Sequence, residues 1–171
     1  NLAGASVTNA GDVNGDGFDD VLIGAPRANP ANFFNGSTYL VFGKATGFSA
    51  EVNLSSLDGS NGSRLDAGRA DDNGVFSGTA ISTAGDVNGD GLDDMIIGAG
   101  GYGFDHPLGI SYVAFGRTST FGAAFALAEL DGKSGFFIGP GGNYSSFSTT
   151  VSNAGDFNGD GFDEVIIGSP F

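Results

Sequence analysis

One stretch of sequence occurs three times in this chain and limits its possible folds more than any other feature. The three copies read VTNAGDVNGDGFDDVLIGAP (7–26), AISTAGDVNGDGLDDMIIGA (80–99) and VSNAGDFNGDGFDEVIIGSP (151–170). Their shared Gly-Asp-x-Asn-Gly-Asp segments are 74 and 70 residues apart. Self-similarity at such a period predicts a repeat architecture, in which each unit is a small supersecondary structure packed against its neighbours.

The similarity extends beyond this stretch. GSTYLVFG (36–43) corresponds to GISYVAFG (109–116), and LSSLDGSNGSRLDAG (54–68) corresponds to LAELDGKSGFFIGPG (127–141). The unit is therefore roughly 70 residues long. We divide the chain accordingly into repeat one (1–74), repeat two (75–144) and half of repeat three (145–171).

Each full repeat is expected to contain four strands, which in repeat one cover residues 6–10, 21–24, 39–42 and 63–65. Glycine supplies 32 of the 171 residues without the three-residue period of collagen, which is typical of many short elements separated by turns. Four antiparallel strands are the unit of a propeller blade. The sequence therefore predicts an all-β fold made of about two and a half β-propeller blades, a partial propeller.

This count gives ten strands, too few to close a ring, because closed propellers use about four to eight blades. An open stack of blades leaves unpaired strand edges and uncovered faces. We therefore expect these residues to be part of a longer chain, or one protomer of a larger assembly.

The aspartate-rich windows have the chemistry of a calcium loop. Each has the form D-x-N-G-D-G-x-D-[DE], with oxygen-bearing side chains at positions 1, 3, 5 and 9. Calcium takes six to eight oxygen ligands in tolerant geometry, whereas magnesium demands a compact octahedron and usually keeps its waters. The two glycines permit the backbone angles of a sharp turn. We predict three Ca²⁺ sites, with position 7 adding its carbonyl oxygen: Asp12, Asn14, Asp16, Phe18 and Asp20; Asp86, Asn88, Asp90, Leu92 and Asp94; and Asp156, Asn158, Asp160, Phe162 and Glu164.

Two other interpretations of these windows are weaker. An EF-hand shares the first six residues, but it needs a glutamate at position 12, where this chain has Ile23, Ile97 and Ile167. A plain hairpin turn needs only one or two residues of the Asp, Asn or Gly type. Here twelve of the 20 acidic residues fall in three nine-residue windows, and their mutual repulsion calls for a cation.

The remaining acid of each window precedes the closing ligand. It is Asp19, Asp93 or Asp163. Successive side chains of a strand point to opposite faces. We therefore expect this acid to point away from the ion, either behind the ligands or into solvent.

These elements resemble the FG-GAP repeats of integrin α-chain propellers and their bacterial relatives. The matching positions are Phe42-Gly43, Phe115-Gly116 and Gly24-Ala25-Pro26, with departures at Gly98-Ala99-Gly100 and Gly168-Ser169-Pro170. The resemblance implies a seven-bladed ring, calcium loops that join the first two strands of a blade on one face, and an activity in binding or adhesion. It also supports metal roles at the fifteen loop positions above.

Composition excludes several other classes of function. The formal net charge of −14, with six basic residues, argues against nucleic acid as a partner. The absence of cysteine rules out disulfides and thiolate metal sites. No apolar run in the sequence approaches the ~18 residues of a membrane span.

Two hypotheses about function remain. The first, which we favour, is a calcium-stabilised structural or adhesive module, secreted or at the cell surface, that meets a protein or polysaccharide ligand. Free calcium is near millimolar outside cells, so weak sites can fill there. The second is a domain of a secreted hydrolase or a lectin-like carbohydrate binder. A triad of His106, Asp105 and Ser111 can be imagined, but adjacent residues rarely face one another and no G-x-S-x-G elbow is present, so we expect no catalysis.

Overall fold

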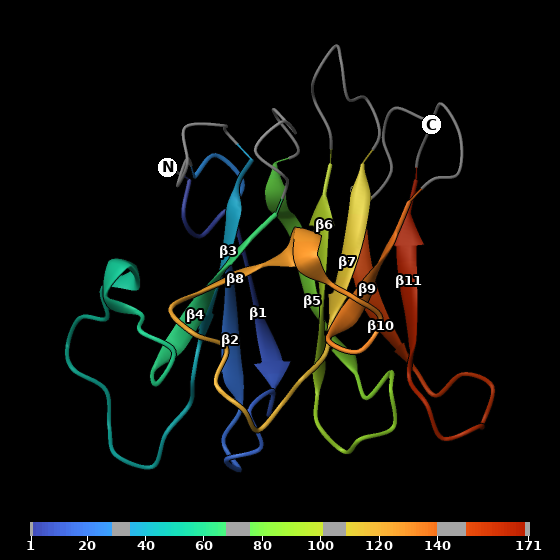
Figure 1. Cartoon of the computed structure of the whole chain (residues 1–171), viewed down its shortest axis with the longest axis horizontal. Helices are drawn as coiled ribbons and strands as arrows, with labels where there is room; N and C mark the ends of the chain where they lie inside the picture. The colour runs from blue at the N-terminus through green and yellow to red at the C-terminus, as the bar shows by residue number, and fades with distance from the viewer. Residues whose placement is uncertain (1, 29–34, 68–75, 101–108, 140–149, 170–171) are drawn as a thin grey trace.

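The computed structural model describes residues 2–28, 35–67, 76–100, 109–139 and 150–169, and these segments form an all-β structure (Figure 1). Its strands are β1 (Ser6–Gly11), β2 (Asp20–Ala25), β3 (Ser37–Val41), β4 (Gly62–Asp66), β5 (Ser77–Gly85), β6 (Asp94–Ala99), β7 (Ile110–Ala114), β8 (Ala124–Ala126), β9 (Gly135–Ile138), β10 (Thr150–Gly155) and β11 (Glu164–Gly168). The predicted fold class is confirmed.

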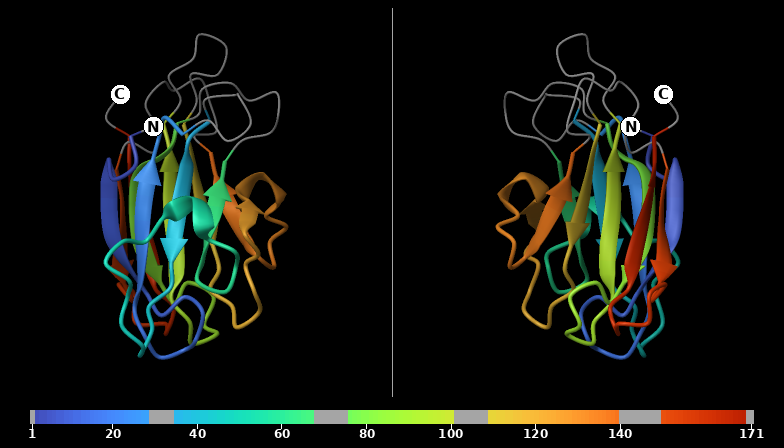
Figure 2. Two further views of the ribbon diagram at one scale, coloured as in Figure 1. Left: turned by 90° about the vertical axis from the view of Figure 1, so that its left-hand side faces the viewer. Right: turned by 90° about the vertical axis from the view of Figure 1, so that its right-hand side faces the viewer.

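The strands form three separate sheets that stand side by side (Figures 1 and 2). Their strand orders are β1-β2-β3-β4-β8, β5-β6-β7-β9 and β10-β11. Every pairing is antiparallel except β4 with β8. The first strands adjoin one another, since β5 packs against β1 on one side and β10 on the other. This is the arrangement of partial propeller blades.

The first two strands of every sheet share one irregularity. The β1–β2 register shifts between Asn9 and Gly11, and the β10–β11 register shifts between Asn153 and Gly155. The equivalent shift in β5–β6 ends at Gly85. Each of these three glycines has a positive φ, which glycine adopts at no steric cost. The bulge turns each first strand into its aspartate-rich loop, and all three loops lie at the same end of the molecule (Figure 1).

The hydrophobic core lies between the sheets. Every residue of β6 is buried, because its sheet is covered on both sides. Several matching residues on the outer sheets are more exposed: Ile96 of β6 is fully buried, whereas Ile166 of β11 is 58% exposed, and Met95 of β6 is fully buried, whereas Val21 of β2 is 40% exposed. Burial therefore follows the position of a sheet in the stack, because the repeats share one sequence pattern.

One strand departs from the prediction of ten. In the connection between β7 and β9, residues of β8 cross to the outer edge of the preceding sheet and pair in parallel with β4, Arg64 opposite Ala124 (Figure 1). The sequence analysis assigned no strand to this segment, because it gave each full repeat only the four strands of a blade. β8 covers the otherwise open edge of β4, which a sheet must protect from pairing with another chain.

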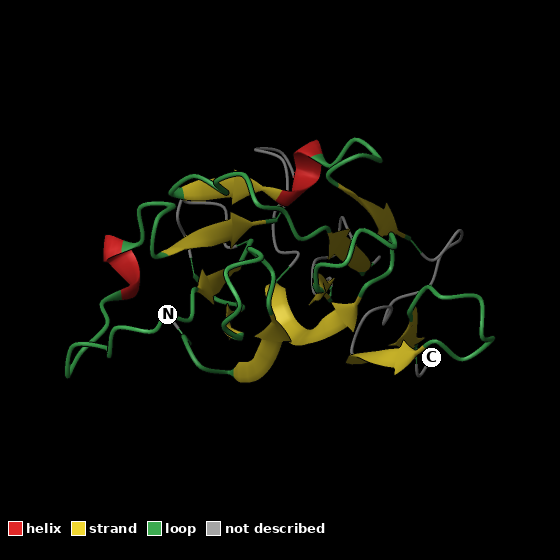
Figure 3. Cartoon of the chain, turned by 90° about the horizontal axis from the view of Figure 1, so that it is seen from below, coloured by secondary structure: helices red, strands yellow, loops and turns green. Residues whose placement is uncertain are grey.

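Helical structure in the described residues amounts to two short 3₁₀ turns, η1 (Leu54–Ser56) and η2 (Leu127–Glu129) (Figure 3). They occupy equivalent places in repeats one and two. None of the helices in the described segments is both long and apolar enough to cross a membrane.

Candidate metal centres

The first aspartate of each window organises its loop. One oxygen of Asp12 accepts hydrogen bonds from the backbone N–H groups of Gly15 at 2.8 Å and Asp16 at 3.0 Å, and the other accepts from Gly17 at 2.9 Å. Asp86 and Asp156 make the same three bonds in their own loops. The loop thus wraps around a carboxylate, a conformation that the positive φ of its two glycines allows.

The polar side chains at positions 3 and 5 are oriented by the backbone around them. In loop one the Asn14 side-chain oxygen accepts from the Asp16 N–H at 2.8 Å, and Asp16 accepts from the Phe18 N–H at 3.0 Å. The Asn14 amide also donates to Asp16 at 3.1 Å. Loop two repeats this pattern with Asn88 and Asp90. Both positions therefore keep oxygen atoms at the solvent side of the loop, where an ion can reach them.

The closing acids of loops one and two are fully buried. One oxygen of Asp20 accepts from the Val13 N–H at 3.1 Å and the other accepts from the Gly43 N–H at 2.8 Å. Asp94 is held in the same way by its own repeat. Burial raises the pKa of both carboxyl groups to about 7, with a smaller contribution from the neighbouring acids of the loop. A carboxyl group in this position needs a proton or a cation to offset its burial.

Loop three brings its acids closest together. Oxygen atoms of Asp156, Asp160 and Glu164 all lie within 4.8 Å of one another. Glu164 accepts from the Phe157 N–H at 2.7 Å and from the Asn158 amide at 2.7 Å. Because calcium–oxygen distances are about 2.3–2.6 Å, a spacing of this size fits ligands around one ion. Among the described residues, these are the three acids whose oxygen atoms come together this closely.

The predicted acidic ligands of loops one and two are gathered less tightly than those of loop three, because backbone hydrogen bonds hold the closing acid of each loop. Asp20 and Asp94 point both oxygens toward backbone N–H groups, and one of these belongs to the Phe-Gly turn after the third strand. A carboxylate oxygen has two lone pairs, so each can still bind a cation. The carbonyl ligands assigned to Phe18, Leu92 and Phe162 stay predictions.

Of the acids that precede the closing ligands, two reach a neighbouring repeat. Asp93 accepts from the backbone N–H of Asp12 at 2.9 Å, and Asp163 accepts from that of Asp86 at 3.0 Å. Asp19 is exposed and accepts from the Asn9 amide at 3.0 Å. The contacts between repeats were not foreseen from the sequence, in which the three acids occupy closely similar contexts.

A family model described as "FG-GAP repeat" matches residues 3–41, 77–114 and 147–171, and each matched segment contains one of the three loops. The chain belongs to the FG-GAP repeat family. The match covers the first two strands and the acidic loop of all three repeats. It therefore confirms the family to which the Phe-Gly and Gly-Ala-Pro elements were assigned.

Several proteins are similar to this FG-GAP chain over nearly all of its length. Integrin alpha pat-2 of Caenorhabditis elegans is 30% identical over 170 residues, which cover 96% of this chain and 12% of that protein. Integrin alpha-4 of Xenopus laevis is 29% identical over 97% of this chain and 14% of its own length. Phosphatidylinositol-glycan-specific phospholipase D of Bos taurus is 30% identical over 98% of this chain and 18% of its own length. The chain thus spans less than a fifth of each relative.

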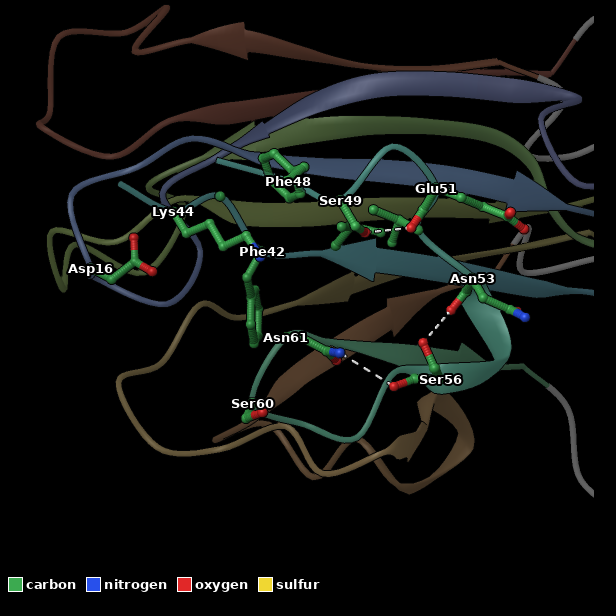
Figure 4. A pocket seen from close by; sticks show the side chains of 13 residues that line it. Asp16, Phe42, Lys44, Phe48, Ser49, Glu51, Asn53, Ser56, Ser60 and Asn61 are labelled. Carbon is green, nitrogen blue, oxygen red and sulfur yellow. Dashed lines mark hydrogen bonds between the residues drawn. The ribbon is translucent and has the colours of Figure 1, made fainter. Parts of the chain in front are cut away.

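A pocket of about 370 Å³ lies beside the first FG-GAP loop (Figure 4). Asp16 and residues of the β3–β4 connection line it, among them Phe48 and Asn53. Its polar groups bond to one another: the Ser56 hydroxyl donates to the Asn53 carbonyl at 2.7 Å, and the Asn61 amide donates to the Ser56 carbonyl at 3.2 Å. These bonds build the connection itself.

The residues of the imagined catalytic triad are not brought together by anything in the described structure. His106 and Asp105 lie outside the described residues, and Ser111 lies on β7 and is fully buried. Of the sites considered from the sequence, the FG-GAP loops are thus the ones whose residues are all described by the structure.

Proposed function

We propose that this chain is a calcium-binding structural or adhesion module of an extracellular protein, in which Ca²⁺ makes the loops between first and second strands rigid. One observation carries the proposal. In three loops at one end of the molecule, the first aspartate accepts the same three backbone hydrogen bonds, and in the third loop the acid oxygens converge within 4.8 Å.

The ligands would be the fifteen loop positions predicted from the sequence. Asp and Asn side chains at positions 1, 3 and 5, the carbonyl at position 7 and the acid at position 9 supply oxygen atoms only, which suits a hard cation. Calcium is favoured over magnesium, because magnesium demands a compact octahedral geometry and usually keeps several of its waters. The bound ion would neutralise acids that otherwise repel one another, including the buried Asp20 and Asp94.

Exposed apolar residues on the two outer sheets support the proposal that this chain is part of a larger structure. Val7 of β1 is 61% exposed and Ile166 of β11 is 58% exposed, although the equivalent residues of the middle sheet are buried. Apolar faces of this kind are typical of surfaces that another element covers. We infer that further blades or another assembly partner cover these faces, with repeat boundaries near residues 74 and 144. The ligand is a protein or polysaccharide surface, as the similarity to proteins named integrin alpha favours.

We further propose that the module is not an enzyme. Propeller folds serve unrelated functions, so a catalytic assignment has to come from a site. The similarity to a phospholipase D covers 18% of that protein.

Thermal unfolding tests the proposal. A ligand that binds only the folded state stabilises it by RT ln(1 + [L]/Kd), so the melting temperature should rise with calcium concentration. The comparison is between excess chelator and about 5–10 mM CaCl₂, the extracellular range and above. MgCl₂ at the same ionic strength is the control for screening. A melting temperature that is identical in chelator and calcium would contradict the proposal.

A further inference from the structure

Asp93 holds the first ligand of the preceding loop at two points. Its carboxylate accepts the Asp12 backbone N–H at 2.9 Å, and its own backbone N–H donates to the Asp12 carbonyl at 3.3 Å. Asp12 and Asp93 are 81 residues apart and lie in the loops of two different sheets. Asp93 is half-buried, so the bond is partly shielded from water.

The same arrangement links repeats two and three. Asp163 accepts the Asp86 N–H at 3.0 Å and donates its backbone N–H to the Asp86 carbonyl at 3.0 Å. We refer to Asp93 and Asp163 as the interblade acids. Hydrogen bonds to a charged acceptor are roughly twice as strong as neutral ones. Recurrence at both junctions between sheets shows that the contact is a property of the repeat.

A glycine makes room for each interblade acid. A Cβ atom at Gly11 would lie 2.2 Å from an Asp93 oxygen, and one at Gly85 would lie 1.8 Å from an Asp163 oxygen. The equivalent Gly155, which faces no following repeat in this chain, has nothing within 4 Å of a Cβ. The glycine before each first ligand therefore provides the space into which the next repeat inserts its carboxylate.

We propose that the interblade acids are positioning residues for the cation site of the preceding repeat, and so couple each cation site to the blade that follows it. Each fixes the backbone of the residue that organises the loop: Asp12 in loop one and Asp86 in loop two. Partners that orient metal ligands typically change metal affinity about 10- to 100-fold when removed. The proposal rests on the calcium function above and extends it to the order and cooperativity of the sites.

Two consequences distinguish this coupling from simple packing. Substitution of Asp93 weakens calcium binding in loop one, although Asp93 lies beside the closing ligand of loop two. Within the described residues, no acid contacts the Asp156 N–H as Asp93 contacts that of Asp12, so we expect loop three to bind calcium more weakly than loops one and two. Asp19, at the same position of repeat one, bonds to Asn9 of its own repeat and serves as a matched control.

Site-resolved calcium titration by ¹H–¹⁵N NMR tests the proposal in the whole chain. The loop glycine amides, at Gly17, Gly91 and Gly161, act as separate probes. In Asp93→Ala the midpoint at Gly17 should move to about ten-fold higher calcium or more. The Gly17 midpoint should move less in Asp19→Ala, which also removes one charge near loop one. Asp93→Asn should restore most of the affinity, because the amide oxygen of asparagine can accept the Asp12 N–H. Hydrogen exchange at the Asp12 amide should accelerate in Asp93→Ala.

The titration distinguishes a failure of the proposed calcium function from a failure of the proposed coupling. If no glycine probe of the parent protein responds to calcium, the proposed function itself is wrong. If the parent responds and Asp93→Ala shifts Gly91 rather than Gly17, or shifts Gly17 no more than Asp19→Ala does, the coupling is wrong. Should Asp93→Ala fail to fold, Asp163→Ala gives the same test on Gly91, because it disturbs the outermost pair of strands.

Discussion

Residues 44–56 and 117–129 are equivalent segments of repeats one and two, but their surroundings differ. In the second segment, Phe121 is 4% exposed and its ring centroid lies 6.1 Å from that of Phe42 in repeat one. In the first segment, the equivalent Phe48 is 54% exposed. The second segment contains β8 and lies along β4 of the preceding sheet, whereas the first segment pairs with no other sheet in the part of the chain that the structure describes.

The difference shows that the burial of a repeat residue is decided by the adjacent repeat. Both segments carry a basic residue over an aromatic ring: Arg117 is 4.1 Å from the Phe121 centroid, and Lys44 is 4.9 Å from the Phe48 centroid. The local structure of the segment is thus preserved in repeat one. What differs is that Phe121 packs against another repeat, whereas Phe48 is exposed. The interblade acids follow the same rule, because Asp93 and Asp163 reach a preceding loop and Asp19 does not.

The largest effect should come from removing the aromatic ring that joins the two repeats. Phe121→Ala should lower the free energy of unfolding by about 3–5 kcal/mol, because a buried phenylalanine leaves a cavity. The matched Phe48→Ala should change it by less than about 0.5 kcal/mol, as is usual for exposed positions. Urea denaturation of both variants gives the comparison. Equal losses in the two variants would show that the segments are in equivalent surroundings after all.

The second comparison concerns the glycines that precede the first ligands. Gly85→Ala and Gly155→Ala both place a side chain at a positive φ, so the backbone strain is matched. Only the former brings a Cβ against Asp163, and overpacking of this kind typically costs about 1–3 kcal/mol more. Chemical denaturation in excess chelator measures the difference without the contribution of calcium. A Gly155→Ala variant as unstable as Gly85→Ala would remove the steric argument.

The smallest expected difference is between the two basic residues. Arg117→Ala should cost about 0.5–2 kcal/mol, because the guanidinium is partly buried and stacks on both Phe121 and Phe125. Lys44→Ala, at an exposed position over one ring, should cost less than about 0.5 kcal/mol. Thermal melts at fixed calcium can resolve the two. A larger loss for Lys44→Ala would reverse the ranking of the two segments.

The sequence predicted the features that depend on residues close together in the chain. The strands that flank each loop, the loop positions and the family all follow from a pattern of about twenty residues that is repeated. The features that it did not predict join distant residues: β8 pairs with a strand of another repeat, and Asp93 contacts a loop 81 residues earlier. Asp19 and Asp93 have the same local context, so only the neighbouring sheet distinguishes them. For β8, the bulky apolar residues Phe121, Phe125 and Leu127, which are separated by even numbers of residues, were a usable signal.

Calorimetric titration of the metal-free chain with calcium tests the central claim most directly, because it counts sites. We predict three calcium ions bound per chain, and two in Asp16→Ala, since every loop draws its ligands from its own repeat. Asp131→Ala, which removes an exposed acid outside the three windows, should retain three and serves as the control for net charge. No saturable binding up to about 10 mM calcium, or three sites in both the parent and Asp16→Ala, would contradict the account.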